Sequence, residues 1–93
     1  MRLDLFLKVS RLIPRRSVAQ KFCEAGLIAV NGTAAKASKE IKAGDAIEIR
    51  RQNRLTRFSV KETPQTRNVS KTSAGALYEL LDEVKVEDDS GLI

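Results

Sequence analysis

The sequence predicts an α+β fold in which two helices pack on a small twisted antiparallel sheet, followed by an acidic C-terminal tail or short helix. Apolar residues recur at helical spacing in residues 3–25, and apolar and polar residues alternate at strand spacing in residues 27–61. Acidic residues dominate the end of the chain. With 93 residues, the chain is long enough for one modest core but not for two full domains.

The N-terminal part of the chain predicts two consecutive helices. Residues 3–13 carry apolar side chains three and four positions apart. Pro14 ends this helix, because its ring disfavours helical geometry in the residue before it. The second helix is expected from Pro14 to Ala25, where Gly26 supplies a left-handed C-cap. A short turn therefore separates the two helices.

A β-ribbon is expected after the helices. Residues 27–30 form a short apolar strand that enters a tight turn at Asn31 and Gly32, a pair that readily adopts positive φ. Residues 47–50 and 55–61 alternate apolar and polar side chains at strand period. We expect these two segments to form a hairpin.

The C-terminal third changes character twice. Periodicity is lost after Pro64, and helical spacing returns over residues 74–84. The apolar stripe of this expected helix consists of Leu77, Leu80, Leu81 and Val84. The predicted organisation is a compact domain over residues 1–62, a linker over 63–73 and an acidic C-terminal helix or tail over 74–93.

The residue content argues against catalysis. The chain has no histidine, which removes the commonest general base and metal ligand, and Cys23 is its single cysteine. Without a histidine to activate it, Cys23 is expected to be a core or boundary residue and not a nucleophile. We therefore expect no enzymatic activity, no cofactor and no metal. The lone thiol and the lack of a long apolar run indicate a cytoplasmic protein without membrane contact.

The charges are segregated along the chain. Of the 17 basic residues only Lys85 follows residue 71, whereas half of the 12 acidic residues lie there. A basic body indicates a polyanionic partner, of which nucleic acid is the commonest. Arg15 and Arg16 fall in the first turn of the second expected helix, where a positive charge opposes the helix dipole. We expect both to bind phosphate, which would relieve this conflict.

Further basic residues are expected to join these two arginines on one surface if the helices pack on the sheet. They are Arg2, Lys8, Arg11, Lys36, Lys39 and Lys42, although Lys42 by itself is explained as a solubilising residue. Asp4 is expected to pair with Lys8, one helical turn later. Only Tyr78 is left as a stacking platform, since the three phenylalanines belong to apolar stripes. This favours recognition of folded RNA by shape and phosphates, with duplex DNA as the open alternative.

Several segments resemble, in order and spacing, the RNA-binding domain named after ribosomal small-subunit protein S4. They are Arg2-Leu3-Asp4, Phe6-Leu7, and residues 15–19 (RRSVA), 26–32 (GLIAVNG), 36–38 (KAS) and 44–47 (GDAI). The resemblance covers roughly residues 1–50 and implies the helix pair on a sheet that is called the alpha-L RNA-binding motif. It implies an RNA surface made of Arg2, Lys8, Arg11, Arg15, Arg16, Asn31, Lys36, Ser38 and Lys39.

Little of the chain remains beyond this domain, which is usually an appendage of larger enzymes. The start of the chain and its acidic end are similar to the small bacterial factors of ribosome-associated quality control. This resemblance implies binding to obstructed large ribosomal subunits that carry a nascent chain. The partners would be large-subunit ribosomal RNA, tRNA and a tailing factor, and P-site peptidyl-tRNA would be stabilised to support C-terminal tailing. Two alternatives stay open, a heat-shock-type recycling factor and a general nucleic-acid-binding protein.

Overall fold

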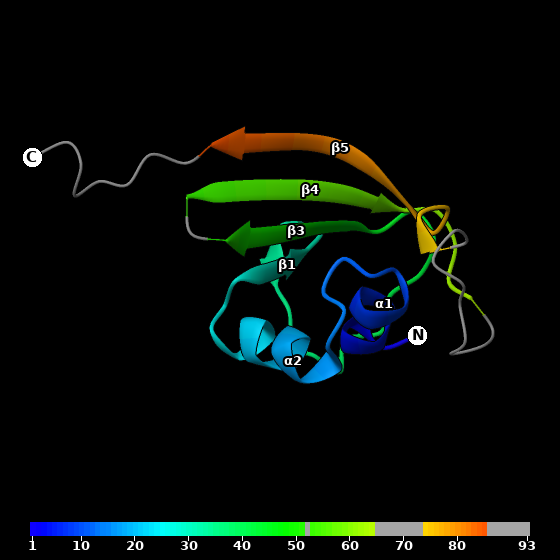
Figure 1. Ribbon diagram of the computed structural model, residues 1–93, viewed down its shortest axis with the longest axis horizontal. Helices are drawn as coiled ribbons and strands as arrows, with labels where there is room; N and C mark the ends of the chain where they lie inside the picture. The colour runs from blue at the N-terminus through cyan, green and yellow to red at the C-terminus, as the bar shows by residue number, and fades with distance from the viewer. Residues whose placement is uncertain (52, 65–73, 86–93) are drawn as a thin grey trace, which may run out of the picture.

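The computed structural model describes residues 1–51, 53–64 and 74–85. Within them, two helices precede an antiparallel sheet with the strand order β2-β1-β3-β4-β5. The elements are α1 (Leu3–Val9), α2 (Arg16–Glu24), β1 (Ile28–Val30), β2 (Thr33–Ala34), β3 (Ala46–Arg51), β4 (Arg54–Val60) and β5 (Tyr78–Lys85). The helices lie beside β1 and β3, and β5 lies at the far edge of the sheet (Figure 1). This arrangement is the predicted α+β fold.

Both helices are shorter than the sequence predicts. Helix α1 ends at Val9 because Arg11 adopts a left-handed conformation with φ of 63° and turns the chain before Pro14 is reached. The Ile13 N–H then donates to the Leu7 carbonyl, at 3.1 Å, and closes the turn. Arg11 therefore lies in this turn and not on α1. No helix in the described part of the chain is long and apolar enough to cross a membrane.

The turn between β1 and β2 confirms the expected hairpin at Asn31 and Gly32. Their φ angles are 52° and 86°, and both residues therefore lie in the left-handed region that the pair tolerates well. Strands β3 and β4 form the second predicted hairpin, in a register that places Ile47 opposite Phe58. Gly26 also adopts a positive φ, of 74°, directly after α2, as expected of a C-cap.

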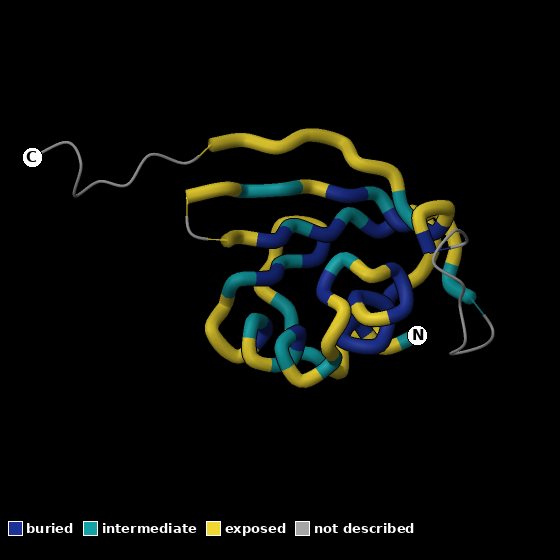
Figure 2. Tube along the Cα trace, viewed as in Figure 1, coloured by how far each residue is buried: buried dark blue, intermediate teal, exposed yellow. Residues whose placement is uncertain are grey.

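The hydrophobic core joins α1 to the sheet. Leu3, Phe6 and Leu7 of α1 have no exposed surface, and they belong to one buried cluster with Ile28 of β1 and Ile47 of β3. Figure 2 shows the buried positions concentrated in α1 and in the strands beside it, whereas β5 is exposed along almost its whole length. The core therefore fixes the N-terminal helix firmly against β1 and β3.

The predicted C-terminal helix over residues 74–84 is wrong, because Tyr78–Lys85 forms strand β5. This strand pairs with β4 along its length, with a bulge in the register opposite Arg57 and Phe58. Leu80 and Leu81 are 54% and 53% exposed, and therefore the leucine spacing that imitates a helix does not form a buried stripe. The extra residue of the bulge breaks the period-2 alternation, and the sequence pattern therefore does not indicate a strand. Residues 65–73 and 86–93 lie outside the described residues, and the division into domain, linker and tail stays a prediction.

Candidate nucleic-acid interface

Asp4 is a fully buried carboxylate in the first turn of α1, and it organises the basic residues around it. Its Oδ2 accepts hydrogen bonds from Gln20 Nε2 at 2.9 Å and from Arg16 Nε at 3.1 Å. Its Oδ1 accepts from Arg2 Nε at 3.2 Å and from the Leu5 N–H at 2.8 Å. One carboxylate thus links residue 2, the start of α1 and the side of α2.

The surroundings of Asp4 keep its carboxyl ionised. Burial alone would raise its pKa, but the hydrogen bonds from Gln20 and Arg16 and the charges of Arg16 and Arg2 outweigh burial, and the pKa lies below its ordinary value. The expected pair between Asp4 and Lys8 is therefore wrong. Lys8 points to the exposed side of α1, whereas Asp4 lies on the buried side, facing α2.

The position of Arg16 at the start of α2 is explained by this carboxylate. A positive charge in the first turn of a helix opposes the macrodipole, and the Asp4 oxygen at 3.1 Å offsets that cost. The side chains of Arg2 and Arg16 nevertheless remain 47% and 34% exposed. A guanidinium has five N–H donors, and the bonds to Asp4 use Nε of both arginines and Nη2 of Arg2. The remaining N–H donors of the two guanidiniums can bind a phosphate.

The segment before Ile41 is fastened to the start of the chain by backbone hydrogen bonds. The Leu3 N–H donates to the Lys39 carbonyl at 2.8 Å, and the Asp4 N–H donates to the Ala37 carbonyl at 3.1 Å. A hollow results between this segment, Arg2 and α2. It is lined by Arg2, Gln20, Cys23, Glu24, Lys36, Ala37 and Ser38.

A second hollow adjoins the first, because both are lined by Lys36 and Ser38. Lys39 and Asn31 also line this second hollow. We call Arg2, Arg16, Lys36, Ser38 and Lys39 together the junction surface. Five of the nine predicted RNA-binding residues thus come together around Asp4.

The side chain of Asn31 forms hydrogen bonds within the fold. Its side-chain amide donates to Asp45 Oδ1 at 3.2 Å, and its Oδ1 accepts from the Ala46 N–H at 2.9 Å. Burial would raise the pKa of Asp45, but the bonds from the Lys42 N–H and Asn31, with the nearby lysine charges, lower it. The bond between Asp45 and Asn31 fixes the turn that ends β1.

The remaining predicted residues are not part of this surface. Lys8 and Arg15 are exposed, and neither lines the two hollows of this surface. Arg11 lines a different hollow, beside β3 and β4. Gln20 was missed by the sequence analysis, although it follows Arg16 by four residues on α2 and therefore shares its face.

Cys23 lies at the edge of the first hollow and is buried, as the sequence predicts. Burial, with the charges of Asp4 and Glu24, raises the pKa of its thiol. A raised pKa disfavours the thiolate that nucleophilic chemistry requires. Among the described residues, no group of three or more potential metal ligands is present.

The chain is similar to known proteins over most of its length. The S4 domain family matches residues 1–47. The RQC P-site tRNA stabilizing factor of Streptococcus pneumoniae is 43% identical over 96% of this chain and 99% of its own length. The factor of the same name from Halalkalibacterium halodurans is 47% identical over 89% of this chain and 92% of its own.

A solved structure supports the fold as well. The trimeric structure of Vibrio cholerae Heat Shock Protein 15 superimposes with a TM-score of 0.78 at 28% identity, covering 87% of this chain and 81% of that one. Because the superposition covers 87% of this chain, the similarity includes most of the sheet as well as the two helices. With an S4 domain at its N-terminus and full-length relatives of one name, the chain belongs to the S4-domain family of RQC P-site tRNA stabilizing factors.

Proposed function

We propose that this protein binds large ribosomal subunits that are obstructed by a nascent chain, and that it stabilises the P-site peptidyl-tRNA there. The relatives that align over nearly the whole chain carry the name RQC P-site tRNA stabilizing factor. The partners are large-subunit ribosomal RNA and tRNA, and the protein works in the cytoplasm, where the ribosomes are. By keeping the tRNA in place, it supports the C-terminal tailing of the stalled chain by a separate quality-control factor.

The single observation that carries this proposal is the pair of arginines held by buried Asp4. Asp4 binds Arg2 and Arg16, whose side chains remain 47% and 34% exposed, and Arg2 lines a hollow together with Lys36 and Ser38. Fixing a side chain before binding lowers the entropy that is lost when it meets a phosphate. Such a surface suits a rigid, folded RNA and performs no bond chemistry. The protein acts by binding, not as an enzyme.

Co-sedimentation with purified large subunits tests the proposal. We expect the parent chain to pellet with subunits that carry peptidyl-tRNA, and to pellet less with empty subunits, because only the former offer both RNAs. Arg16→Ala should weaken this binding by about 1–3 kcal/mol, the loss of one charge-assisted contact. Lys61→Ala serves as a control, since Lys61 is exposed at the end of β4 and lines no described hollow. Equal binding to obstructed and empty subunits would contradict the proposal.

A recycling role without tailing is the second candidate, and the likeness to Heat Shock Protein 15 is consistent with it. The two roles predict different results for the C-terminal tails of stalled nascent chains. If the gene is deleted, alanine tails on stalled nascent chains should disappear when the protein supports tailing. Unchanged tails, with altered release of the obstructed subunits, would favour the recycling role.

A further inference from the structure

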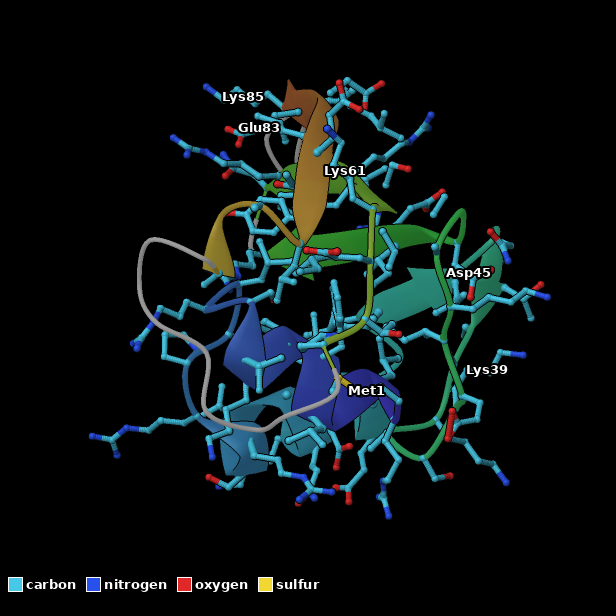
Figure 3. The ribbon with its side chains drawn as sticks, turned by 90° about the vertical axis from the view of Figure 1, so that its right-hand side faces the viewer. Met1, Lys39, Asp45, Lys61, Glu83 and Lys85 are labelled. Carbon is cyan, nitrogen blue, oxygen red and sulfur yellow. The ribbon has the colours of Figure 1, made fainter. Side chains whose placement is uncertain are left out.

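A hollow on the helix-facing side of the sheet shares no residue with the junction surface. It lies between the turn after α1 and the strands β3, β4 and β5, where the helices do not reach. It is lined by Arg11, Leu12, Ile49, Arg51, Arg54, Thr56, Phe58, Tyr78, Leu80 and Glu83. Figure 3 shows Glu83 near the top of the view, well away from Met1 and Lys39. The hollow is therefore a separate place on the protein.

Three arginines from three different segments stand at this hollow. Arg11 comes from the turn after α1, Arg51 from β3 and Arg54 from β4, and all three are exposed. Within the hollow, only Glu83 opposes them, with its Oε1 at 3.4 Å from Arg54 Nη1. The side chain of Arg11 forms no hydrogen bond or ion pair with any described residue. The hollow thus carries an excess of positive charge.

Two contacts fix the orientation of the Arg51 guanidinium. Its Nη2 donates to the Leu12 carbonyl at 2.7 Å, and its guanidinium lies over the ring of Phe22, 5.7 Å from the centroid. A guanidinium that is stacked on one face leaves its other face and its outer donors for a ligand. Unpaired nucleotides in RNA are commonly bound by such planes.

The hollow also has an apolar side. Leu80 is 54% exposed there, and Phe58 packs edge to face with Tyr78, with their centroids 5.3 Å apart. Arginines beside apolar carbon match a ligand that has both phosphate and a flat ring. An acidic peptide would use the charges but leaves the flat apolar side without a matching group.

We propose that the hollow formed by Arg11, Arg51 and Arg54, which we call the arginine hollow, binds a second RNA segment through its phosphates and an unpaired base. The junction surface and the arginine hollow would then hold two RNA segments at two separate places on one small domain. The inference rests on the proposed function, since that function requires contact with both ribosomal RNA and tRNA. The backbone strain of Arg11, an arginine at φ of 63°, agrees with a side chain placed for binding.

Quantitative pelleting with large subunits that carry peptidyl-tRNA tests the arginine hollow. Arg54→Ala should weaken binding about 5- to 30-fold, and the slope of log affinity against log salt should become less steep by about 1. Arg11→Gly should weaken binding in the same range, and it keeps the fold because glycine accepts a positive φ. The melting temperature of each variant checks the fold.

Arg50→Ala is the matched control. Arg50 precedes Arg51 on β3 and pairs with Leu55, and it therefore faces the opposite side of the sheet. Its loss removes the same charge and should change the affinity by less than about twofold. If Arg54→Ala and Arg50→Ala bind as tightly as the parent, the arginine hollow is not an RNA site.

Photo-crosslinking identifies the ligand class. Benzoylphenylalanine in place of Leu80 should crosslink to RNA, whereas the same group in place of Val84, which pairs with Leu55 on the other side of the sheet, should not. A crosslink from position 80 only to protein, a ribosomal protein or this chain itself, overturns the inference. If the parent chain fails to bind obstructed subunits, the proposed function fails. Binding of the same variants to deproteinised large-subunit RNA then tests separately whether the arginine hollow binds RNA.

Discussion

Asp4 is the residue on which the junction surface depends. It carries a negative charge in a protein that binds a polyanion, and simple charge counting would make it harmful to binding. Its full burial and its bonds to Arg2, Arg16 and Gln20 give it the opposite role. A carboxylate beneath two guanidiniums orients them, and its charge is screened from the ligand by the arginines that it holds. Asp4 is therefore a positioning residue.

Asp4→Asn tests this role. The variant should lose about 1–3 kcal/mol of stability, because a buried charged hydrogen-bond network loses its centre. It should also bind obstructed subunits more weakly, although it carries one negative charge fewer. Equilibrium unfolding and pelleting measure the two effects.

Glu24→Gln is the control for the charge change. Glu24 is exposed at the edge of the same hollow, and its replacement also removes one negative charge. Binding by this variant should stay equal to the parent or become slightly tighter. If Asp4→Asn binds as tightly as Glu24→Gln, the orienting role of Asp4 is refuted.

The depressed pKa of Asp4 predicts an acid-sensitive contribution to stability. The contribution is complete above about pH 5, since the carboxyl is then ionised in both the folded and the unfolded chain. It is lost as the pH falls below about 4 and through the lower pKa of the folded state. The difference in unfolding free energy between the parent and Asp4→Asn should therefore shrink between pH 5 and pH 3. A difference that does not change with pH would contradict this account, and the depressed pKa of Asp45 affects both chains alike.

At the scale of elements, β5 completes the sheet. The expected helix and the observed strand differ in which leucines of this segment they bury. A docked helix would bury Leu77 and Leu81 on the same face. In the structure Leu77 is 3% exposed and its backbone binds Lys61, whereas Leu81 lies at the bulge and is 53% exposed. Tyr78 covers Phe58. Burial in this segment is therefore confined to its start.

Leu77→Ala and Leu81→Ala separate the strand from the helix. Leu77→Ala should cost about 2–5 kcal/mol, as expected of a leucine removed from a core, and Leu81→Ala should change stability by less than about 0.5 kcal/mol. Urea denaturation of the two variants measures the difference. Comparable losses for both would indicate the helical arrangement.

The elements that the sequence predicted correctly have local causes. Asn31 and Gly32 encode their turn, and alternation encodes the β3–β4 hairpin, because each signal lies within a few residues. The end of α1 was misplaced because Arg11 adopts its positive φ without a glycine or asparagine to indicate it. Strand β5 was missed because its pairing partner lies far away in sequence and its bulge hides the period.

At the scale of the whole molecule, the contrast between a basic body and an acidic end has a structural explanation. Asp82 and Glu83 of β5 lie 3.8 Å and 3.4 Å from Arg57 and Arg54 of β4, and thus part of the acidic end faces arginines of the body. Exposed pairs of this kind contribute little to stability. Their effect is on the electrostatic field, since each carboxylate reduces the positive potential around the β4 arginine with which it pairs.

The sequence predicted which basic residues belong to the candidate site, but not which contacts hold them together. Charge and the S4 resemblance predicted Arg2, Arg16 and Lys36 as RNA-binding residues, because basic residues and short motifs are visible in the sequence. Neither showed that Asp4 lies beneath the arginines, because that contact joins α1 to α2 across a turn. Asn31 was assigned to RNA, and its bonds to Asp45 and Ala46 show what its amide does within the fold.

The retention of peptidyl-tRNA on obstructed large subunits tests the central claim most directly. The half-life of the bound peptidyl-tRNA would be measured without protein, with the parent chain, and with Arg16→Ala. We predict that the parent lengthens the half-life and that Arg16→Ala, at equal concentration, lengthens it much less. A half-life that is the same with and without the parent chain would contradict the claim that this protein stabilises P-site tRNA.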